Sequence, residues 1–198
     1  MALSLNILFV ASEAVPLAKT GGLGDMVGAC AGALQRTGVH VSVMLPGYPN
    51  AIAQLQHART VCEWTDLPGG RARLLSGRMG TLGIPVLVFD APALFARPGN
   101  PYLDEHGEPY DDNALRFAAF SHAAARVASG VPDVPRFDIV HAHDWHTGLV
   151  PMFIKQAGTA VKTVFTVHNL AFQGNFPMGV TPQIGVPADA AHAAEFWG

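Results

Sequence analysis

The stretch Lys19–Asp25, with the sequence KTGGLGD, decides the fold of this chain. It follows an apolar run at 5–10 (LNILFV) and precedes a segment of small and apolar residues at 26–34. A strand, a glycine-rich turn and a helix in this order are typical of α/β proteins. In such a turn the backbone is not shielded by side chains, and the N–H groups that open the helix can face an anion. We therefore expect this turn to bind a phosphate or a sugar with several hydroxyl groups.

The spacing of the glycines excludes the two best-known nucleotide motifs. Gly22, Gly24 and Gly28 follow the pattern G-x-G-x-x-x-G, whereas the dinucleotide motif requires G-x-G-x-x-G. The next expected strand, at 39–45, ends without the acidic residue that would hold a ribose. A Walker loop, G-x-x-x-x-G-K-[ST], is absent from the sequence.

Two charged residues flank the glycines. Lys19 adds a mobile positive charge, and a lysine in such a loop has little to pack against. Asp25 is predicted to cap the helix, with hydrogen bonding to a ligand hydroxyl as the alternative role.

The composition indicates a well-buried α/β protein. Of 198 residues, 49% are hydrophobic and 14% are charged, and the net charge of -3 without a basic cluster argues against nucleic-acid binding. Cys30 and Cys62 lack the spacing of a metal site or a disulfide framework, so we expect reduced thiols. No signal peptide and no apolar run of the ~18 residues that span a membrane is visible, which favours a cytoplasmic location and no membrane partner.

Apolar segments alternate with helical segments along the chain, which predicts a mainly parallel sheet with helices on both faces. The expected strands are 5–10, 39–45, 84–89, 137–140 and 161–167, with an antiparallel hairpin at 59–64 and 71–79. The expected helices are 25–36, about 111–129 and one from about 147, and a long loop is expected at 91–110.

Polar residues follow three of the expected strands. They are Ser12-Glu13, His141–His146 (HAHDWH) and His168-Asn169. Ligands of open α/β sheets bind at the carboxyl ends of strands, so these groups are predicted to line one edge together with the glycine turn. Tyr102, in the long loop, could offer a flat ring and a hydroxyl to a sugar there.

The histidine-rich stretch has two interpretations. His141 and His143 face the same side of a strand and could share a metal with Asp144, as in a metal-dependent hydrolase. Asp144 lies one place too early for the H-x-H-x-D-H pattern, and a metal-free role, in which Asp144 binds ligand hydroxyls, is favoured. His168 could act as a donor, an acceptor or a general acid.

Several stretches together resemble bacterial glycogen synthase and plant starch synthase. They are Lys19–Asp25, His141–His146 and 164–174 (VFTVHNLAFQG), with 12–16 (SEAVP) and 97–102 (RPGNPY) in support. The resemblance covers almost the whole chain, with the motifs in the family's order.

This resemblance implies a retaining glucosyltransferase of the GT-B fold, in which two Rossmann-like domains face each other across a cleft. It implies transfer of glucose from ADP-glucose to the non-reducing end of an α-1,4-glucan, without a metal or other cofactor. By motif match, the implied catalytic residues are His168 and Asp144. The implied substrate-binding residues are Glu13, Lys19, Gly21, Gly22, Asp25, Tyr102 and Asn169.

The resemblance also implies that 1–198 is the N-terminal Rossmann-like domain alone. The chain ends at Gly198, before the C-terminal nucleotide-binding domain of the family. We therefore expect the chain alone to be inactive, because the groups that grip the diphosphate and the adenine belong to that missing partner domain. A non-catalytic glucan-binding module is the alternative.

Overall fold

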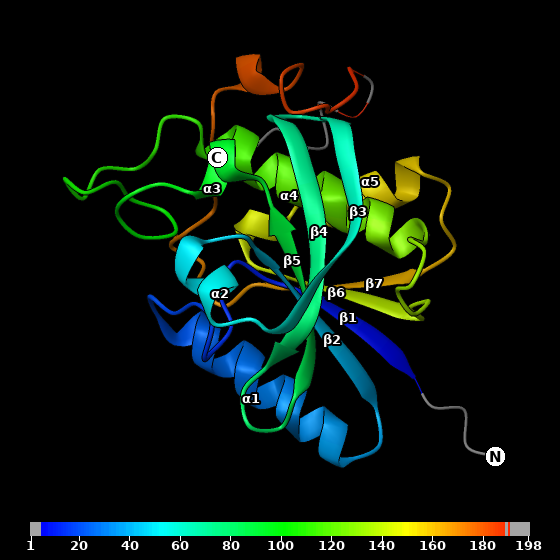
Figure 1. Ribbon diagram of the computed structural model, residues 1–198. Coiled ribbons are helices and arrows are strands. Elements are labelled where there is room, and N and C mark those ends of the chain that lie inside the picture. The colour runs from blue at the N-terminus through cyan, green and yellow to red at the C-terminus, as the bar shows by residue number, and fades with distance from the viewer. Residues whose placement is uncertain (1–4, 189, 191–198) are drawn as a thin grey trace.

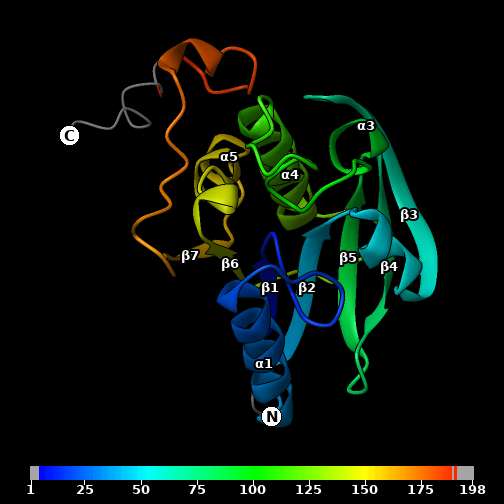
Figure 2. The ribbon, with the colours of Figure 1, turned by 90° about the vertical axis from the view of Figure 1, so that its left-hand side faces the viewer.

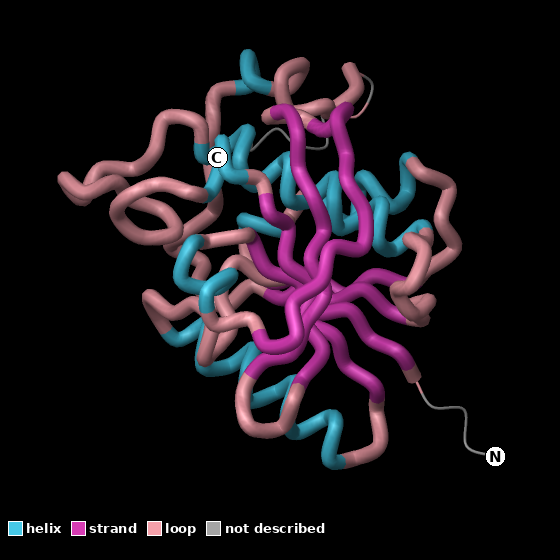
Figure 3. The backbone as a smooth tube through the Cα atoms, viewed as in Figure 1, coloured by secondary structure: helices cyan, strands magenta, loops and turns pink. Residues whose placement is uncertain are grey.

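A seven-stranded sheet is the centre of the computed structural model, which describes residues 5–188 and 190. The strand order is β3-β4-β5-β2-β1-β6-β7. The strands are β1 (Asn6–Val10), β2 (His40–Pro46), β3 (Gln56–Leu67), β4 (Gly70–Met79), β5 (Ile84–Asp90), β6 (Ile139–His143) and β7 (Lys162–Thr166). The pairs β1–β2, β1–β6, β2–β5 and β6–β7 are parallel, and the β3–β4 hairpin extends the sheet antiparallel beside β5. Figure 3 shows the strands twisting across one another through the middle of the molecule.

Helices cover both faces of the sheet. They are α1 (Gly22–Arg36), α2 (Pro49–Ala53), α3 (Pro92–Phe95), α4 (Asn113–Ser129) and α5 (Val150–Gln156), with single 3₁₀ turns at Trp145–Thr147 and Met178–Val180. The connection through α1 leads from β1 to β2, toward one edge of the sheet. The connections through α4, from β5 to β6, and through α5, from β6 to β7, lead toward the opposite edge. Because such crossovers are right-handed, α1 lies on one face and α4 with α5 on the opposite face (Figures 1 and 2). The predicted three-layer α/β architecture is confirmed.

The expected elements agree with the structure except at a few boundaries. Short helices begin at Pro49 and Pro92, the second of them inside the expected long loop, because proline suits the first position of a helix. The predicted strand 137–140 lies instead at Ile139–His143. Its polar histidines were read as following the strand, but the ladder with β7 continues to the pair His143–Thr166.

The predicted helix cap at Asp25 is wrong, and α4 has no side-chain cap. The N-cap of α1 is Gly21, in an extended conformation, and Asp25 lies inside the first turn with its carboxylate 2.7 Å from the Nζ of Lys19. At α4 the N-cap is Asp112, but its side chain makes no capping hydrogen bond and instead accepts both guanidinium N–H groups of Arg97 at 2.7 and 2.6 Å. In both places the carboxylate pairs with a nearby cation and not with the backbone N–H groups of the helix.

A buried arginine holds the long loop before α4 against the core. Arg116 is 1% exposed, and its Nε donates to the carbonyl of Leu94 at 2.8 Å. Its Nη1 donates to the carbonyl of Pro101 at 3.1 Å and to Oδ1 of Asn113 at 2.6 Å, and the guanidinium lies 4.4 Å from the centre of the Tyr110 ring. The loop therefore has a fixed path despite its lack of regular structure.

No helix in the described ranges, 5–188 and 190, combines the length and the apolar character that crossing a membrane requires.

We predict that Arg116→Met lowers the free energy of unfolding by about 3 kcal/mol, because it removes charge-assisted hydrogen bonds from buried acceptors. Urea unfolding measures the loss. The matched control is Arg71→Met, since the Arg71 side chain is 82% exposed and should tolerate the change. Equal stability of the two variants would contradict this account of the loop.

Candidate functional site

The strand order puts a topological switch point at the carboxyl ends of β1 and β6, where open α/β proteins bind ligands, and this region is called the crevice below. The connection from β1 leads to β2 on one side, whereas the connection from β6 leads to β7 on the other side. Glu13 follows β1, Asp144 follows β6 and His168 follows β7. The predicted clustering of polar groups at one edge of the sheet therefore agrees with the topology.

Glu13 joins the end of β1 to the glycine turn. It is 2% exposed, and its Oε2 accepts the backbone N–H groups of Thr20 at 2.5 Å and Gly21 at 3.1 Å. Its Oε1 accepts the hydroxyls of Thr20 at 2.6 Å and Tyr102 at 2.5 Å. Both oxygens thus serve protein groups, and a direct contact of Glu13 with a sugar stays a prediction.

Tyr102 brings the long loop to the same point. Its hydroxyl lies 2.7 Å from Oγ of Ser12, and its ring stacks on His146 with a centroid distance of 4.5 Å. Burial, with smaller contributions from Tyr48 and Glu13, raises the pKa of Tyr102 well above its usual value. The hydroxyl therefore stays protonated and donates to Glu13, while the stacked imidazole covers one side of the ring that was predicted to face a sugar.

The start of α1 is open to a ligand. The first N–H groups of a helix, here those of Gly22 and Leu23, have no acceptor within the helix. A Cβ atom at Gly21 or Gly22 would meet no other atom within 4 Å, so space is available beside the backbone. The ion pair of Lys19 and Asp25 lies at the same turn with both side chains about half exposed, at 53% and 55%.

On the other side of the crevice, Asp144 organises the ends of β6 and β7. It is 8% exposed, and its Oδ1 accepts the backbone N–H of His168 at 2.7 Å. Its φ of 59° and ψ of 176° lie in a region that non-glycine residues rarely adopt. The hydroxyl of Thr147 donates to the carbonyl of His143 at 2.8 Å, which stabilises this turn. Strain of this kind is typical of functional sites.

His141, His143 and His168 are hydrogen-bonded to other protein groups and are not arranged around a shared metal position. His141 and His143 do lie on the same side of β6, with ring centroids 4.1 Å apart. However, Nε2 of His141 lies 2.7 Å from the hydroxyl of Thr166, and Nδ1 of His143 lies 3.1 Å from Nε2 of His168. Within residues 5–188 and 190, no three His, Cys, Asp or Glu side chains are placed to share a metal ion. The metal-dependent hydrolase therefore gains no support.

Asn169 shapes the loop that follows β7. Its Oδ1 accepts the backbone N–H of Ala171 at 2.9 Å, which forms an Asx turn. The residue is exposed, and a sugar contact through its amide group stays a prediction.

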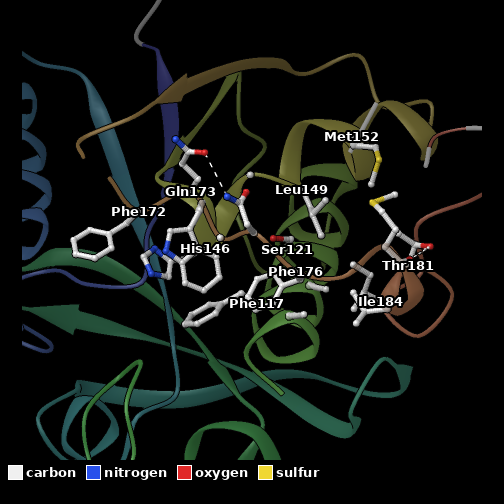
Figure 4. A pocket seen from close by; sticks show the side chains of 18 of the residues that line it. Phe117, Ser121, His146, Leu149, Met152, Phe172, Gln173, Phe176, Thr181 and Ile184 are labelled. Carbon is white, nitrogen blue, oxygen red and sulfur yellow. Dashed lines mark hydrogen bonds between the residues drawn. The ribbon is translucent and has the colours of Figure 1, made fainter. Parts of the chain in front are cut away.

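A large apolar cavity of about 1050 Å³ lies beside the crevice (Figure 4). Aromatic side chains of α4, of the turn after β6 and of the loop after β7 line it, among them Phe117, Trp145 and Phe172. Gly174 is required here, because a Cβ atom would lie 2.5 Å from the Trp145 ring. Trp145 and His146, from the predicted histidine-rich stretch, line this cavity, but none of the residues implied to be catalytic or substrate-binding does. The apolar residues that follow His168 in the sequence are the pattern that could have indicated it.

His146 is enclosed by aromatic rings between crevice and cavity. It is 7% exposed, and its ring lies 4.1 Å from that of Trp145 and 4.8 Å from that of Phe117. Burial, with a smaller contribution from the charge of Arg116, lowers the pKa of His146 to about 3. Burial likewise lowers the pKa of His143 to about 3, with help from neighbouring histidines. Both imidazoles are therefore neutral near pH 7.

With this geometry established, the chain can be compared with known proteins. A protein-family profile described as "Starch synthase catalytic domain" matches residues 6–198. The chain belongs to this starch synthase family. Glycogen synthase of Ralstonia nicotianae is 71% identical over 196 residues, and glycogen synthase of Bordetella petrii is 50% identical over 181 residues. The matches cover 99% and 91% of this chain but 36% and 34% of the relatives, so the chain spans about a third of their length.

A solved structure of the family has the same fold. The catalytic domain of starch synthase IV from Arabidopsis thaliana, bound to ADP and acarbose, superposes with a TM-score of 0.76 at 29% identity. The match covers 94% of this chain and 38% of that one. The predicted resemblance to glycogen and starch synthases is therefore confirmed.

We predict that Glu13→Gln destabilises the glycine turn. The new NH₂ group cannot accept, so it faces either the two backbone N–H groups of the turn or the hydroxyl of Tyr102, at a cost of about 1–3 kcal/mol. Urea unfolding and amide exchange at Thr20 and Gly21 measure the effect. Glu105→Gln is the control, because the Glu105 side chain is 63% exposed. Unchanged protection of both amides would contradict the role of Glu13.

We predict a loss of stability in mild acid. Below pH ~6.5 the unfolded chain protonates histidines that the folded chain keeps neutral down to about pH 3. Stability therefore falls with falling pH in this window, by up to ~1.4 kcal/mol per pH unit for each such histidine. Urea unfolding at about pH 7 and about pH 5 should show a smaller loss for His146→Gln than for the natural chain. His106→Gln, at a side chain 78% exposed, should leave the loss of stability unchanged. A loss that is reduced in His106→Gln but not in His146→Gln would contradict the prediction.

Proposed function

We propose that this chain is the N-terminal domain of a glycogen synthase, which transfers glucose from ADP-glucose to the non-reducing end of an α-1,4-glucan with retention of configuration. The observation that carries the proposal is the 71% identity, over 99% of the chain, to a relative named glycogen synthase. The structural relative bound to ADP supports a donor that carries this nucleotide.

The glycine turn is proposed to bind the diphosphate of the donor. As the bond to glucose breaks, negative charge builds up on the leaving diphosphate. In this proposal, Lys19 and the N–H groups at the start of α1 stabilise that charge, and their common location at the glycine turn supports it. Gly21 and Gly22 let the phosphates approach the backbone. Asp25 keeps the Lys19 side chain at the turn until the donor arrives.

The opposite wall of the crevice is proposed to bind the transferred glucose. Asp144 and His168 are held together by a hydrogen bond, and both offer polar atoms to sugar hydroxyls. The transition state of glycosyl transfer has oxocarbenium character, so dipoles and a carboxylate near the sugar lower its energy. Asn169, Glu13 and Tyr102 complete the proposed sugar-binding set.

Further polypeptide is proposed to complete the enzyme as a second Rossmann-like domain. Among the described strands, β7 pairs with β6 alone, so its other edge is open. Val164, Phe165 and Val167 are 44%, 44% and 48% exposed, a high fraction for apolar residues in and beside a strand. These features support additional chain in this region, and the relatives are about three times as long.

The proposal is tested with a full-length protein of this sequence and its Lys19→Ala variant. The variant should lower kcat/KM for glucose transfer from ADP-glucose to glycogen by about 10²-fold, as expected for loss of one charge-stabilising group. The control variant Lys155→Ala, at an exposed lysine of α5, should leave kcat/KM unchanged. Residues 1–198 alone should transfer no glucose.

Transfer by residues 1–198 alone at the full-length rate would contradict the two-domain proposal. Glycogen binding by the full-length protein without any transfer would favour the glucan-binding module instead.

A further inference from the structure

Three histidines form a row across the crevice end of the sheet. His141 and His143 come from β6, and His168 follows β7. The Phe9 ring packs against the first two in T-shaped geometry, with centroid distances of 5.1 and 5.0 Å. His141 is half-buried, His143 in the middle of the row is buried, and His168 at its end is exposed.

His143 and His168 meet edge to edge. Nδ1 of His143 lies 3.1 Å from Nε2 of His168, while the ring centroids are 5.3 Å apart and the planes differ by 30°. With the nitrogens so much closer than the centroids, the two atoms point at each other and the ring faces do not overlap. This geometry is that of a hydrogen bond, in which one nitrogen carries the proton and the other accepts it.

The surroundings of His143 decide which nitrogen donates. Its Nε2 is buried and has no hydrogen-bond partner within the described part of the chain. A proton on that nitrogen would leave a buried N–H donor unsatisfied, which proteins avoid more strictly than an unsatisfied acceptor. The proton of neutral His143 therefore belongs on Nδ1, facing His168.

We propose that His143 is a positioning residue, which donates its Nδ1–H to Nε2 of His168 and so fixes His168 as the neutral tautomer with the proton on Nδ1. A neutral imidazole whose Nε2 accepts must carry its own proton on Nδ1. A doubly protonated His168 would set two donors against each other at 3.1 Å. His168 thus presents a neutral N–H donor on its free side, which suits the oxygen of a sugar hydroxyl.

The proposal that the Nδ1–H group of His168 binds glucose rests on the proposed function, whereas the assignment of the His168 tautomer does not rest on it. The state of each ring nitrogen is read from long-range ¹H–¹⁵N spectra of the ¹⁵N-labelled chain near neutral pH. His168→Gln identifies the signals of His168. We expect a protonated Nδ1 and a bare Nε2 at His168, and the same arrangement at His143. A protonated Nε2 at His168 in the natural chain would overturn the proposal without any variant of His143.

Variants of His143 separate positioning from a structural role. His143→Asn keeps an N–H donor near the place of Nδ1 and should preserve the tautomer of His168. His143→Leu removes the donor, and the His168 proton should move at least partly to Nε2. His141→Asn is the control, since His141 bonds Thr166 and not His168, and should leave the His168 signals in place. An unchanged tautomer in His143→Leu would refute the role of His143.

The activity of the full-length protein separately tests whether the His168 donor is used in glucose transfer. If the tautomer is as stated and the protein transfers glucose, His143→Leu should lower kcat more than His143→Asn does. If the tautomer is as stated and no transfer occurs, the positioning role stands and the proposed function fails.

Discussion

The crevice depends on the hydrogen bonds that the buried carboxylate of Glu13 accepts. A charged group at 2% exposure must be compensated by hydrogen bonds, and Glu13 receives four. They come from the glycine turn and from Tyr102, which is 89 residues away in sequence. One anion thus fixes two irregular segments against the end of β1. It also occupies the amides of Thr20 and Gly21, which leaves the N–H groups one step further along, at Gly22 and Leu23, for a ligand.

The two walls of the crevice carry different polar groups. The turn side has Lys19, paired with Asp25, the buried carboxylate of Glu13 and the positive end of α1, whereas the β6–β7 side has neutral His143 and the carboxylate of Asp144. Glycosyl transfer puts negative charge on the leaving diphosphate and positive charge on the sugar. The proposed donor would accordingly place its diphosphate at the start of α1 and its glucose beside Asp144.

Local sequence patterns predicted the strands, the helices and the edge at which polar residues gather, because these depend on periodicity and on glycine and proline. They did not predict the partners of buried polar groups. Asp25 was predicted to be a cap, but α1 begins at Gly22, so Asp25 lies inside the first turn and pairs with Lys19 instead. Arg116 reads as an ordinary helix residue, although it anchors a loop through carbonyl groups that no side-chain pattern reveals. Likewise, His143 was read as a ligand candidate, while its contact with His168 depends on the β6–β7 register.

The position of β1 between β2 and β6 bears on the order of folding. Asn6 donates its N–H to the Asp138 side chain across 132 residues, whereas β2 to β5 meet over much shorter stretches. Closing the longer loop costs more chain entropy and slows the contacts that require it. The β6–β7 pair also forms between segments that are close in sequence, whereas the docking of β6 on β1 joins distant segments. We therefore expect the docking of these two parts, which creates the crevice, to be among the last steps in the folding of this domain.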